Sequence, residues 1–266
     1  MTGRVLIIAG SDSGGGAGIQ ADIKTVTALG GFAMTAVTAI TVQNTLGVTG
    51  IHPIPLDMVT AQARAVLDDI GADTIKTGML GTVEMVETVC KLLDAYSKIP
   101  AIIDPVMIAK GGHPLLEANG IAAIKDLLVP RVALLTPNAP EAAALTGLKV
   151  ETLDDQRRAG EALLRLGAKA VLMKGGHQDG DTVSDLLVTS EGETLFQGPR
   201  IHSRHTHGTG CTLASACATG LAQGLTLTES VSRARDYVVE AMRTAPGFGQ
   251  GHGPLNHGWP FRAQEA

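Results

Sequence analysis

Short apolar runs alternate with amphipathic stretches along most of the chain, a pattern that predicts buried strands separated by helices. Apolar runs predict strands at residues 5–9, 32–40, 74–76, 101–103, 132–135 and 170–173, and a hairpin at residues 185–188 and 193–196. Helical spacing predicts helices at residues 18–29, 56–70, 83–96, 121–128 and 154–166, with two more at the C-terminal end. We therefore expect one α/β domain over residues 1–266, with a central, mostly parallel sheet covered by helices on both faces.

The composition suits such a core and narrows the class of partner. Hydrophobic residues make up 44% of the chain and aromatic residues only 3%, so Ala, Val, Leu and Ile must fill the core. A formal charge of −5 without a basic run argues against nucleic acid as the main partner. Three cysteines without a CxxC spacing favour a reducing compartment. With neither a signal peptide nor an uninterrupted apolar span, we expect a cytoplasmic protein that binds small molecules, not a membrane.

Polar residues follow the predicted strands at the point where each strand ends. Residues 10–16 follow the first strand, Asp104 follows a middle one, residues 136–138 the next, and residues 174–177 a later one. The carboxyl ends of parallel strands meet at one edge of a sheet, where ligands of such folds bind. The sequence therefore predicts an active site at this edge.

Residues 205–212, His-Thr-His-Gly-Thr-Gly-Cys-Thr, run into an apolar segment and predict a glycine-rich turn that opens a buried helix. Glycines allow close approach of the backbone, and the free amides of a first helical turn bind anions such as phosphate. The helix dipole is expected to lower the pKa of Cys211 and make its thiolate available as a base. An ordinary helix start with a small buried cysteine is the other interpretation, and the turn alone does not decide between the two.

Two carboxylates and one lysine at the same edge favour phosphoryl chemistry. Asp104 and Glu141 offer the hard oxygen ligands that Mg²⁺ prefers, and Lys174 offers a positive charge for a transferring phosphoryl group. Taken singly, Asp104 is also typical of a turn before proline, and Glu141 of the first turn of a helix.

Competing motifs fit less well. The chain contains no Gly-Lys dipeptide and hence no Walker-type loop, and no acid between residues 24 and 57 could hold the ribose of a dinucleotide. The spacing of His202, His205, His207 and Cys211 matches no common zinc pattern.

A resemblance to a known family covers nearly the whole chain. The segments that carry it are residues 9–12, 15–25, 42–45, 78–80, 104–107, 136–141, 173–177 and 206–212. Together they resemble bacterial hydroxymethylpyrimidine/phosphomethylpyrimidine kinase, a ribokinase-superfamily enzyme of thiamine biosynthesis. One departure is Ser13, since the first loop of the family often reads Asp-Pro-Ser-Gly-Gly, and we expect a looser loop here.

The resemblance implies a ribokinase-like three-layer fold and ATP-dependent, Mg²⁺-assisted phosphorylation of 4-amino-5-hydroxymethyl-2-methylpyrimidine and then of its monophosphate. It implies that Cys211 is the base and that Gly208, Thr209 and Gly210 form the anion hole with it. Asn138, Lys174 and Thr206 would bind the nucleotide with Gly208 and Gly210, while Asp104 and Glu141 would hold Mg²⁺. The pyrimidine would contact Gly10, Ala17, Asp22, Gln43, Met79 and Val106.

The family also suggests a homodimer. Two alternatives stay open: a pyridoxine or pyridoxal kinase, whose substrate shares the ring-bound hydroxymethyl group, and a non-catalytic pyrimidine-binding protein on the same fold. Retention of Asp104, Lys174 and Cys211 disfavours the second alternative.

Overall fold

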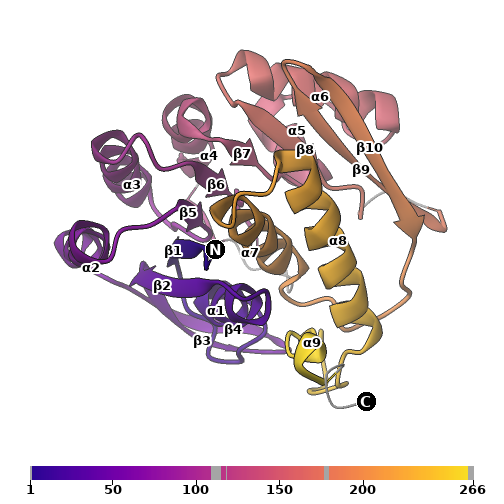
Figure 1. The fold of residues 1–266 in the computed structure, drawn as a ribbon, viewed down its shortest axis with the longest axis horizontal. Coiled ribbons are helices and arrows are strands. Elements are labelled where there is room, and N and C mark those ends of the chain that lie inside the picture. Colours follow the sequence, from indigo (N-terminus) through magenta and orange to yellow (C-terminus); the bar gives the residue numbers. More distant parts are fainter. Residues whose placement is uncertain (1, 109–114, 118, 177–179, 263–266) are drawn as a thin grey trace.

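The computed structural model describes residues 2–108, 115–117, 119–176 and 180–262, so His177 of the last rim motif lies outside the described residues (Figure 1). An eight-stranded sheet forms the centre of the molecule, in the order β10-β9-β8-β7-β6-β5-β1-β2. Its parallel strands are β1 (Arg4–Ala9), β2 (Phe32–Val37), β5 (Thr74–Thr77), β6 (Ala101–Ile103), β7 (Leu134–Leu135) and β8 (Ala170–Met173). The predicted hairpin is confirmed as the longer antiparallel pair β9 (Thr182–Thr189) and β10 (Gly192–Pro199).

Helices cover both faces of this sheet, which confirms the predicted three-layer architecture (Figure 1). One layer contains α2 (Leu56–Asp69), α3 (Val83–Ala95), α4 (Gly120–Ala123), α5 (Ala139–Thr146) and α6 (Leu153–Arg165). The other contains α1 (Gly18–Ala28), α7 (Thr209–Ala222) and α8 (Leu227–Arg243), and the short α9 (Trp259–Arg262) follows near the C-terminal end. Successive strand residues point to opposite faces, so Leu6 joins the first core and Ile7 the second.

The strand predicted at residues 32–40 is wrong in its last three residues. The main-sheet strand β2 ends at Val37, where the amide of Thr38 donates to the carbonyl of Ala9 (3.0 Å) and its hydroxyl donates to the carbonyl of Met79 (2.8 Å). The chain then leaves the sheet and forms a separate antiparallel pair, β3 (Ala39–Asn44) and β4 (Gly47–Pro53). These tertiary bonds carry the β3–β4 pair past the carboxyl end of β1.

Two other segments differ from prediction. The helix predicted at residues 121–128 becomes α4, a π-helical turn (Ile124–Leu128) and a 3₁₀ turn (Val129–Arg131), and the strand predicted at residues 132–135 shortens to β7. Helices α5 and α9 were not predicted, although the Asn138 and Glu141 pair is a capping box typical of a helix start. In the described part of the chain, no helix is long and apolar enough to span a membrane.

Helix α7 begins where the backbone comes into contact with the loop after β1. Its N-cap residue Gly208 has a φ of 86°, and a Cβ atom there would lie 1.8 Å from the carbonyl oxygen of Gly16. Only glycine therefore fits between the two loops. Gly224, just beyond the other end of α7, has a φ of 88° with open space around it.

These two glycines provide a matched pair of variants. Gly224→Ala adds only left-handed backbone strain, so we expect it to lower the free energy of unfolding by about 1–2 kcal/mol. Gly208→Ala adds the collision with Gly16, and we expect a loss of about 3 kcal/mol or more. Urea unfolding of both variants measures the difference. Equal losses would show that the contact with Gly16 relaxes without cost.

A buried histidine anchors the C-terminal segment against the helical layer. His257 is 4% exposed, its Nε2 lies 2.9 Å from the hydroxyl of Thr212, and its carbonyl accepts a hydrogen bond from Tyr237 (2.7 Å). Burial lowers the pKa of His257 to about 4, with smaller effects of Lys24 and His207 in the same direction.

Stability is therefore expected to depend on His257 in mildly acidic solution. Between about pH 4 and 6.5 the unfolded chain binds a proton at this histidine that the folded protein excludes, so stability falls as the pH falls through this window, by on the order of 3 kcal/mol. Urea unfolding from pH 4.5 to 7.5 should show a shallower pH dependence for His257→Asn. The exposed His202→Asn is the control, and an equal slope in both variants contradicts the assignment.

Candidate active site

The loops that follow β1, β6 and β8 meet the N-terminus of α7 at the carboxyl edge of the sheet. The strand order reverses between β1 and β5, because β2 lies on one side of β1 and β5 on the other. Such a switch point leaves a crevice in which open α/β sheets bind ligands. The rim predicted from the sequence thus lies at the switch point of the sheet.

The carboxylate of Asp12 organises the first loop (residues 10–16). Asp12 is 1% exposed and accepts hydrogen bonds from the amides of Gly14 (2.8 Å), Gly16 (3.1 Å) and Ala17 (2.8 Å). Nε2 of His207 donates to the same carboxylate at 2.8 Å. Burial alone would raise the pKa of Asp12, but the hydrogen bonds from His207 and the amides outweigh it and lower the pKa. The first loop and the glycine-rich turn (residues 205–212) are therefore locked together.

Ser13 ties the first loop to the β3–β4 pair, so the expectation of a looser loop is wrong. Its hydroxyl accepts a hydrogen bond from the amide of Gln43 (2.8 Å) and donates one to the carbonyl of Gln43 (2.7 Å). The side-chain amide of Gln43 accepts from the hydroxyl of Thr41 (3.3 Å) and lies 3.4 Å from Nε2 of His207. Gln43 is thus held in place while remaining partly exposed.

Four of the residues expected to contact the pyrimidine are linked through these contacts. Ala17 and Gln43 both reach Asp12, directly or through His207, and Met79 lies over Gly10, where an added Cβ would be 2.6 Å from the methionine methyl group. Val106 is placed by its amide, which donates to the carbonyl of Asp104 (2.8 Å). Met79 thus lies against Gly10, while Ala17 and His207 gather at the carboxylate of Asp12.

Asp22, also expected to contact the ring, lies inside the protein instead. Its two carboxylate oxygens are each 2.8 Å from Nζ of Lys76, and the hydroxyl of Ser215 donates to one of them at 2.7 Å. The side chains of both ions are fully buried. Burial raises the pKa of Asp22, whereas for Lys76 the effect of burial is outweighed by Asp22 and the pKa is raised. This ion pair was not predicted from the sequence.

Lys174 lies between two carboxylates beside the start of α7. Its Nζ is 3.0 Å from Oδ1 of Asp104 and 3.7 Å from Oε2 of Glu141. A Cβ on Gly210 would lie 3.3 Å from this Nζ and 3.4 Å from Oδ2 of Asp104. Although burial alone would lower it, the two carboxylates hold the pKa of Lys174 above its ordinary value. The predicted phosphate and metal residues thus lie together against the glycine-rich turn.

Glu141 has a structural role as well as a place in this cluster. Its carboxylate accepts from the amide of Asn138 (2.8 Å), whose side chain accepts from the amide of Glu141 (2.9 Å), and the two residues cap α5. Burial raises the pKa of Glu141 to about 7, against the opposing effect of Lys174. The interpretation of Glu141 as an acid in the first turn of a helix is confirmed. The same carboxylate also lies 3.7 Å from Nζ of Lys174.

The donor set of Asp104 and Glu141 suits a magnesium ion that keeps most of its water. Among the described residues no group of three or more His, Cys, Asp or Glu side chains could hold a metal by itself. Mg²⁺ commonly needs only one or two carboxylates, because water and substrate phosphates complete its shell. His202, His205, His207 and Cys211, whose spacing matches no common zinc pattern, form no such group in the described part of the chain.

The prediction for the Cys211 thiol is wrong in sign. Cys211 is partly exposed, yet burial of its thiol raises the pKa to about 12. The ammonium of Lys76 and the amide of Gly18 lower the pKa, whereas Asp22 and Asp104 raise it. Desolvation by the surrounding protein therefore outweighs the position at the start of a helix.

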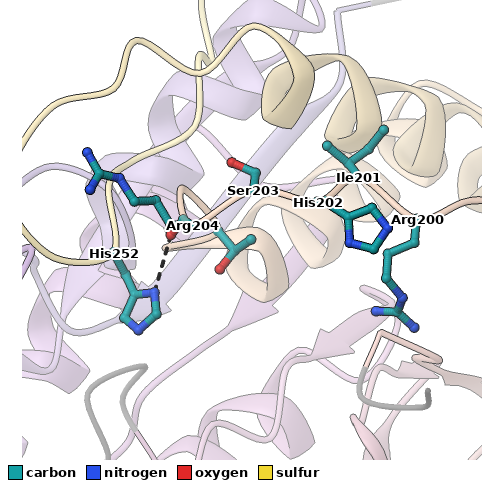
Figure 2. A pocket seen from close by; sticks show the side chains of 7 residues that line it. Arg200, Ile201, His202, Ser203, Arg204 and His252 are labelled. Carbon is teal, nitrogen blue, oxygen red and sulfur yellow. Dashed lines mark hydrogen bonds between the residues drawn. The ribbon is translucent and has the colours of Figure 1, made fainter. Parts of the chain in front are cut away.

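A basic depression on the segment that joins β10 to α7 was not predicted from the sequence. A cavity of about 490 Å³ is lined by Arg200, Ile201, His202, Ser203, Arg204, Thr206 and His252. Figure 2 shows His252 turned toward Arg204, whose carbonyl accepts from its Nδ1 at 3.2 Å. Thr206 belongs to the glycine-rich turn, so the cavity borders the predicted anion site. The basic residues within positions 200–205 were the available sequence signal.

Known proteins resemble this chain in both sequence and fold. The sequence model of the phosphomethylpyrimidine kinase family matches residues 12–256. The hydroxymethylpyrimidine/phosphomethylpyrimidine kinase of Bacillus subtilis is 48% identical over 255 residues, which is 96% of this chain and 94% of that protein.

Solved structures agree with the sequence match. The ADP complex of Bacillus subtilis pyridoxal kinase has a TM-score of 0.90 and 34% identity, covering 97% of this chain and 98% of that one. Phosphomethylpyrimidine kinase from Clostridium difficile has a TM-score of 0.81 and 40% identity, covering 90% of this chain and 98% of that one. With a rim that joins Lys174, Asp104 and the glycine-rich turn, the chain belongs to the phosphomethylpyrimidine kinase family.

Proposed function

We propose that the protein transfers a phosphoryl group from ATP to the hydroxymethyl oxygen of 4-amino-5-hydroxymethyl-2-methylpyrimidine, and then a second one to the monophosphate, in thiamine biosynthesis. The observation that carries this proposal is the cluster of Lys174, Asp104 and Gly210 at the N-terminus of α7. Helix amides and a lysine at one point suit the charge of a transferring phosphoryl group. The ADP complex of the related pyridoxal kinase supports an adenine nucleotide as donor.

In this proposal the amides of Gly208, Thr209 and Gly210 hold the γ-phosphate, and Lys174 neutralises its oxygens. The hydroxymethyl oxygen attacks the γ-phosphorus, its proton passes to the thiolate of Cys211, and the bond to the bridging oxygen breaks, so that ADP leaves. Asp104 and Glu141 would hold Mg²⁺, which neutralises phosphate charge when bound. Asn138 and Thr206 border the nucleotide, and the cavity beside Thr206 takes its outer part.

The pyrimidine lies between Met79 and the polar wall formed by Gln43 in this proposal. Gln43 offers both a donor and an acceptor, which match the edge of an aminopyrimidine. The backbone of Gln43 is fixed by two hydrogen bonds with Ser13, and its side-chain oxygen accepts from Thr41, so little conformational freedom is lost on binding.

Pyridoxal phosphorylation is the second candidate, favoured by the likeness to Bacillus subtilis pyridoxal kinase. Pyridoxal also carries a hydroxymethyl group on a heteroaromatic ring, so the same base and anion site would serve it. We further propose that residues 1–266 form one domain and that the protein is a cytoplasmic homodimer. Light scattering of the purified protein tests the dimer.

A coupled assay of ADP release tests the reaction itself. With MgATP we expect turnover of the pyrimidine alcohol and of its monophosphate, with a lower kcat/KM for pyridoxal. Cys211→Ala should lower kcat by about 100-fold or more, because general-base catalysis contributes a factor of that order. Preference for pyridoxal would select the second candidate, and wild-type turnover by Cys211→Ala would exclude Cys211 as the base.

Replacement of Gln43 tests the recognition of the ring. Gln43→Ala leaves buried polar groups of the ligand unpaired, so we expect pyrimidine binding to weaken by about 1–3 kcal/mol, with the KM for ATP unchanged. The matched control is Asn44→Ala, an exposed amide one position further along β3. Steady-state kinetics with each substrate varied in turn measures both constants. An unchanged KM for the pyrimidine in Gln43→Ala would remove this residue from the ring site.

A further inference from the structure

The buried pair of Lys76 and Asp22 lies against the middle of α7, where the hydroxyl of Ser215 donates to Asp22. Strand β5 and helix α7 run past one another in opposite directions: the hydroxyl of Thr74 donates to the carbonyl of Ala218 (3.2 Å), and two residues later Lys76 reaches Ser215 through Asp22. Later residues of the strand therefore lie beside earlier residues of the helix. The next step leads from Ser215 to Cys211, which lies one turn earlier on the same helical face.

The side chain of Lys76 extends in this direction. Its Nζ lies 3.2 Å from the position of a Cβ on Gly78, two residues further along the chain and already in the loop after β5. The ammonium group is thus carried from the middle of a buried strand toward the rim that holds Cys211. Within the described part of the chain, its hydrogen bonds go to the two oxygens of Asp22, which leaves one of its three N–H donors for another neighbour.

Such a fully buried ion pair needs an explanation beyond stability. Burial of two charges costs several kcal/mol per ion before their attraction is counted, and apolar pairs of similar volume often stabilise a core as well or better. Lys76 belongs to strand β5, whose four residues are all buried. A function at the adjacent site accounts for a charge in this place.

We propose that Lys76, fixed by Asp22 and Ser215, is a positioning residue whose ammonium charge stabilises the thiolate of Cys211. The inference rests on the proposed function, in which that thiolate accepts the proton of the attacking alcohol. Lys76 has the largest lowering effect on the pKa of Cys211, and Cys211 in turn raises the pKa of Lys76. Asp22 has two effects: it fixes the ammonium in place and opposes part of its charge.

The other charged groups around Cys211 do not replace Lys76. Those that face the thiol from the surrounding elements are Asp22 on α1, Asp104 after β6 and Lys174 after β8, with Glu141 of α5 beside Lys174. Lys174 is paired with Asp104 and faces the phosphate side of the site. Lys76 is therefore the cation that remains beside the thiol while phosphate groups enter and leave.

Alkylation of Cys211 by iodoacetamide without substrates tests this proposal, because only the thiolate reacts. In Lys76→Met we expect the alkylation rate at pH 8 to fall about tenfold or more, since one pKa unit changes the thiolate fraction tenfold. In Lys76→Arg, which keeps a cation beside Asp22, we expect a rate close to that of the wild type. A loss in Lys76→Met that Lys76→Arg largely restores supports the proposal, whereas equal losses in both variants, or none in Lys76→Met, overturn it.

Cys217, buried on the same helix, is the internal control for folding. Peptide mass spectrometry follows both cysteines in one sample, and local unfolding would speed alkylation of Cys217 in the same variant. If that happens in Lys76→Met, the comparison moves to the double variant Asp22→Asn/Lys76→Met, which buries no unpaired charge. Slower alkylation of Cys211 in the double variant than in the wild type supports the proposal, and a rate equal to that of the wild type contradicts it.

Kinetics separates this proposal from the proposed function. In Lys76→Met we expect a lower kcat and an upward shift of the pH–rate profile, with an unchanged KM for MgATP. If Cys211→Ala retains full turnover, the thiol is not the base, but the alkylation rates still decide whether Lys76 controls it. If pyridoxal proves to be the preferred substrate, the alkylation test is unaffected.

Discussion

The shape of the active site depends on the carboxylate of Asp12. It binds three amides of its own loop and the ring of His207, and His207 lies against Gln43. One buried anion thus joins the loop after β1, the turn before α7 and the β3–β4 pair. Its desolvation is offset because nearly every oxygen lone pair has a donor, which is the condition under which a buried charge is tolerated.

The contact between Gly16 and Gly208 follows from this arrangement. Once Asp12 draws the two loops together, no space is left for a side chain at the N-cap of α7, so the helix begins without a side-chain cap and places Gly210 beside Lys174 and Asp104. An ordinary N-cap side chain would occupy these amides itself. The absence of a capping side chain therefore leaves the helix terminus free to bind an anion.

Local patterns in the sequence predicted most of the sheet and the position of the rim. Buried parallel strands are continuous apolar runs, and the polar residues that end them must lie at one edge. Three features depended on tertiary contacts instead: the turn of the chain at Thr38, the partner of Asp22 and the pKa of Cys211. Lys76 is 54 residues from Asp22 in the chain, and nothing in the neighbouring residues of either indicates their pairing. The helix dipole was visible in the sequence, but the desolvation that outweighs it was not.

These surroundings also explain why a thiol suits position 211 better than a carboxylate. Asp22, Asp104 and Glu141 already gather around two ammonium groups, and one further fixed anion about 4 Å from another costs on the order of 4 kcal/mol at an effective dielectric near 20. The proposed second acceptor is itself a phosphate monoester with nearly two negative charges. Burial that raises the pKa of Cys211 keeps the thiol neutral in the resting enzyme, so a doubly charged acceptor meets no further fixed anion there. The thiolate that takes the proton of the alcohol has to form beside Lys76, whose positive charge balances it.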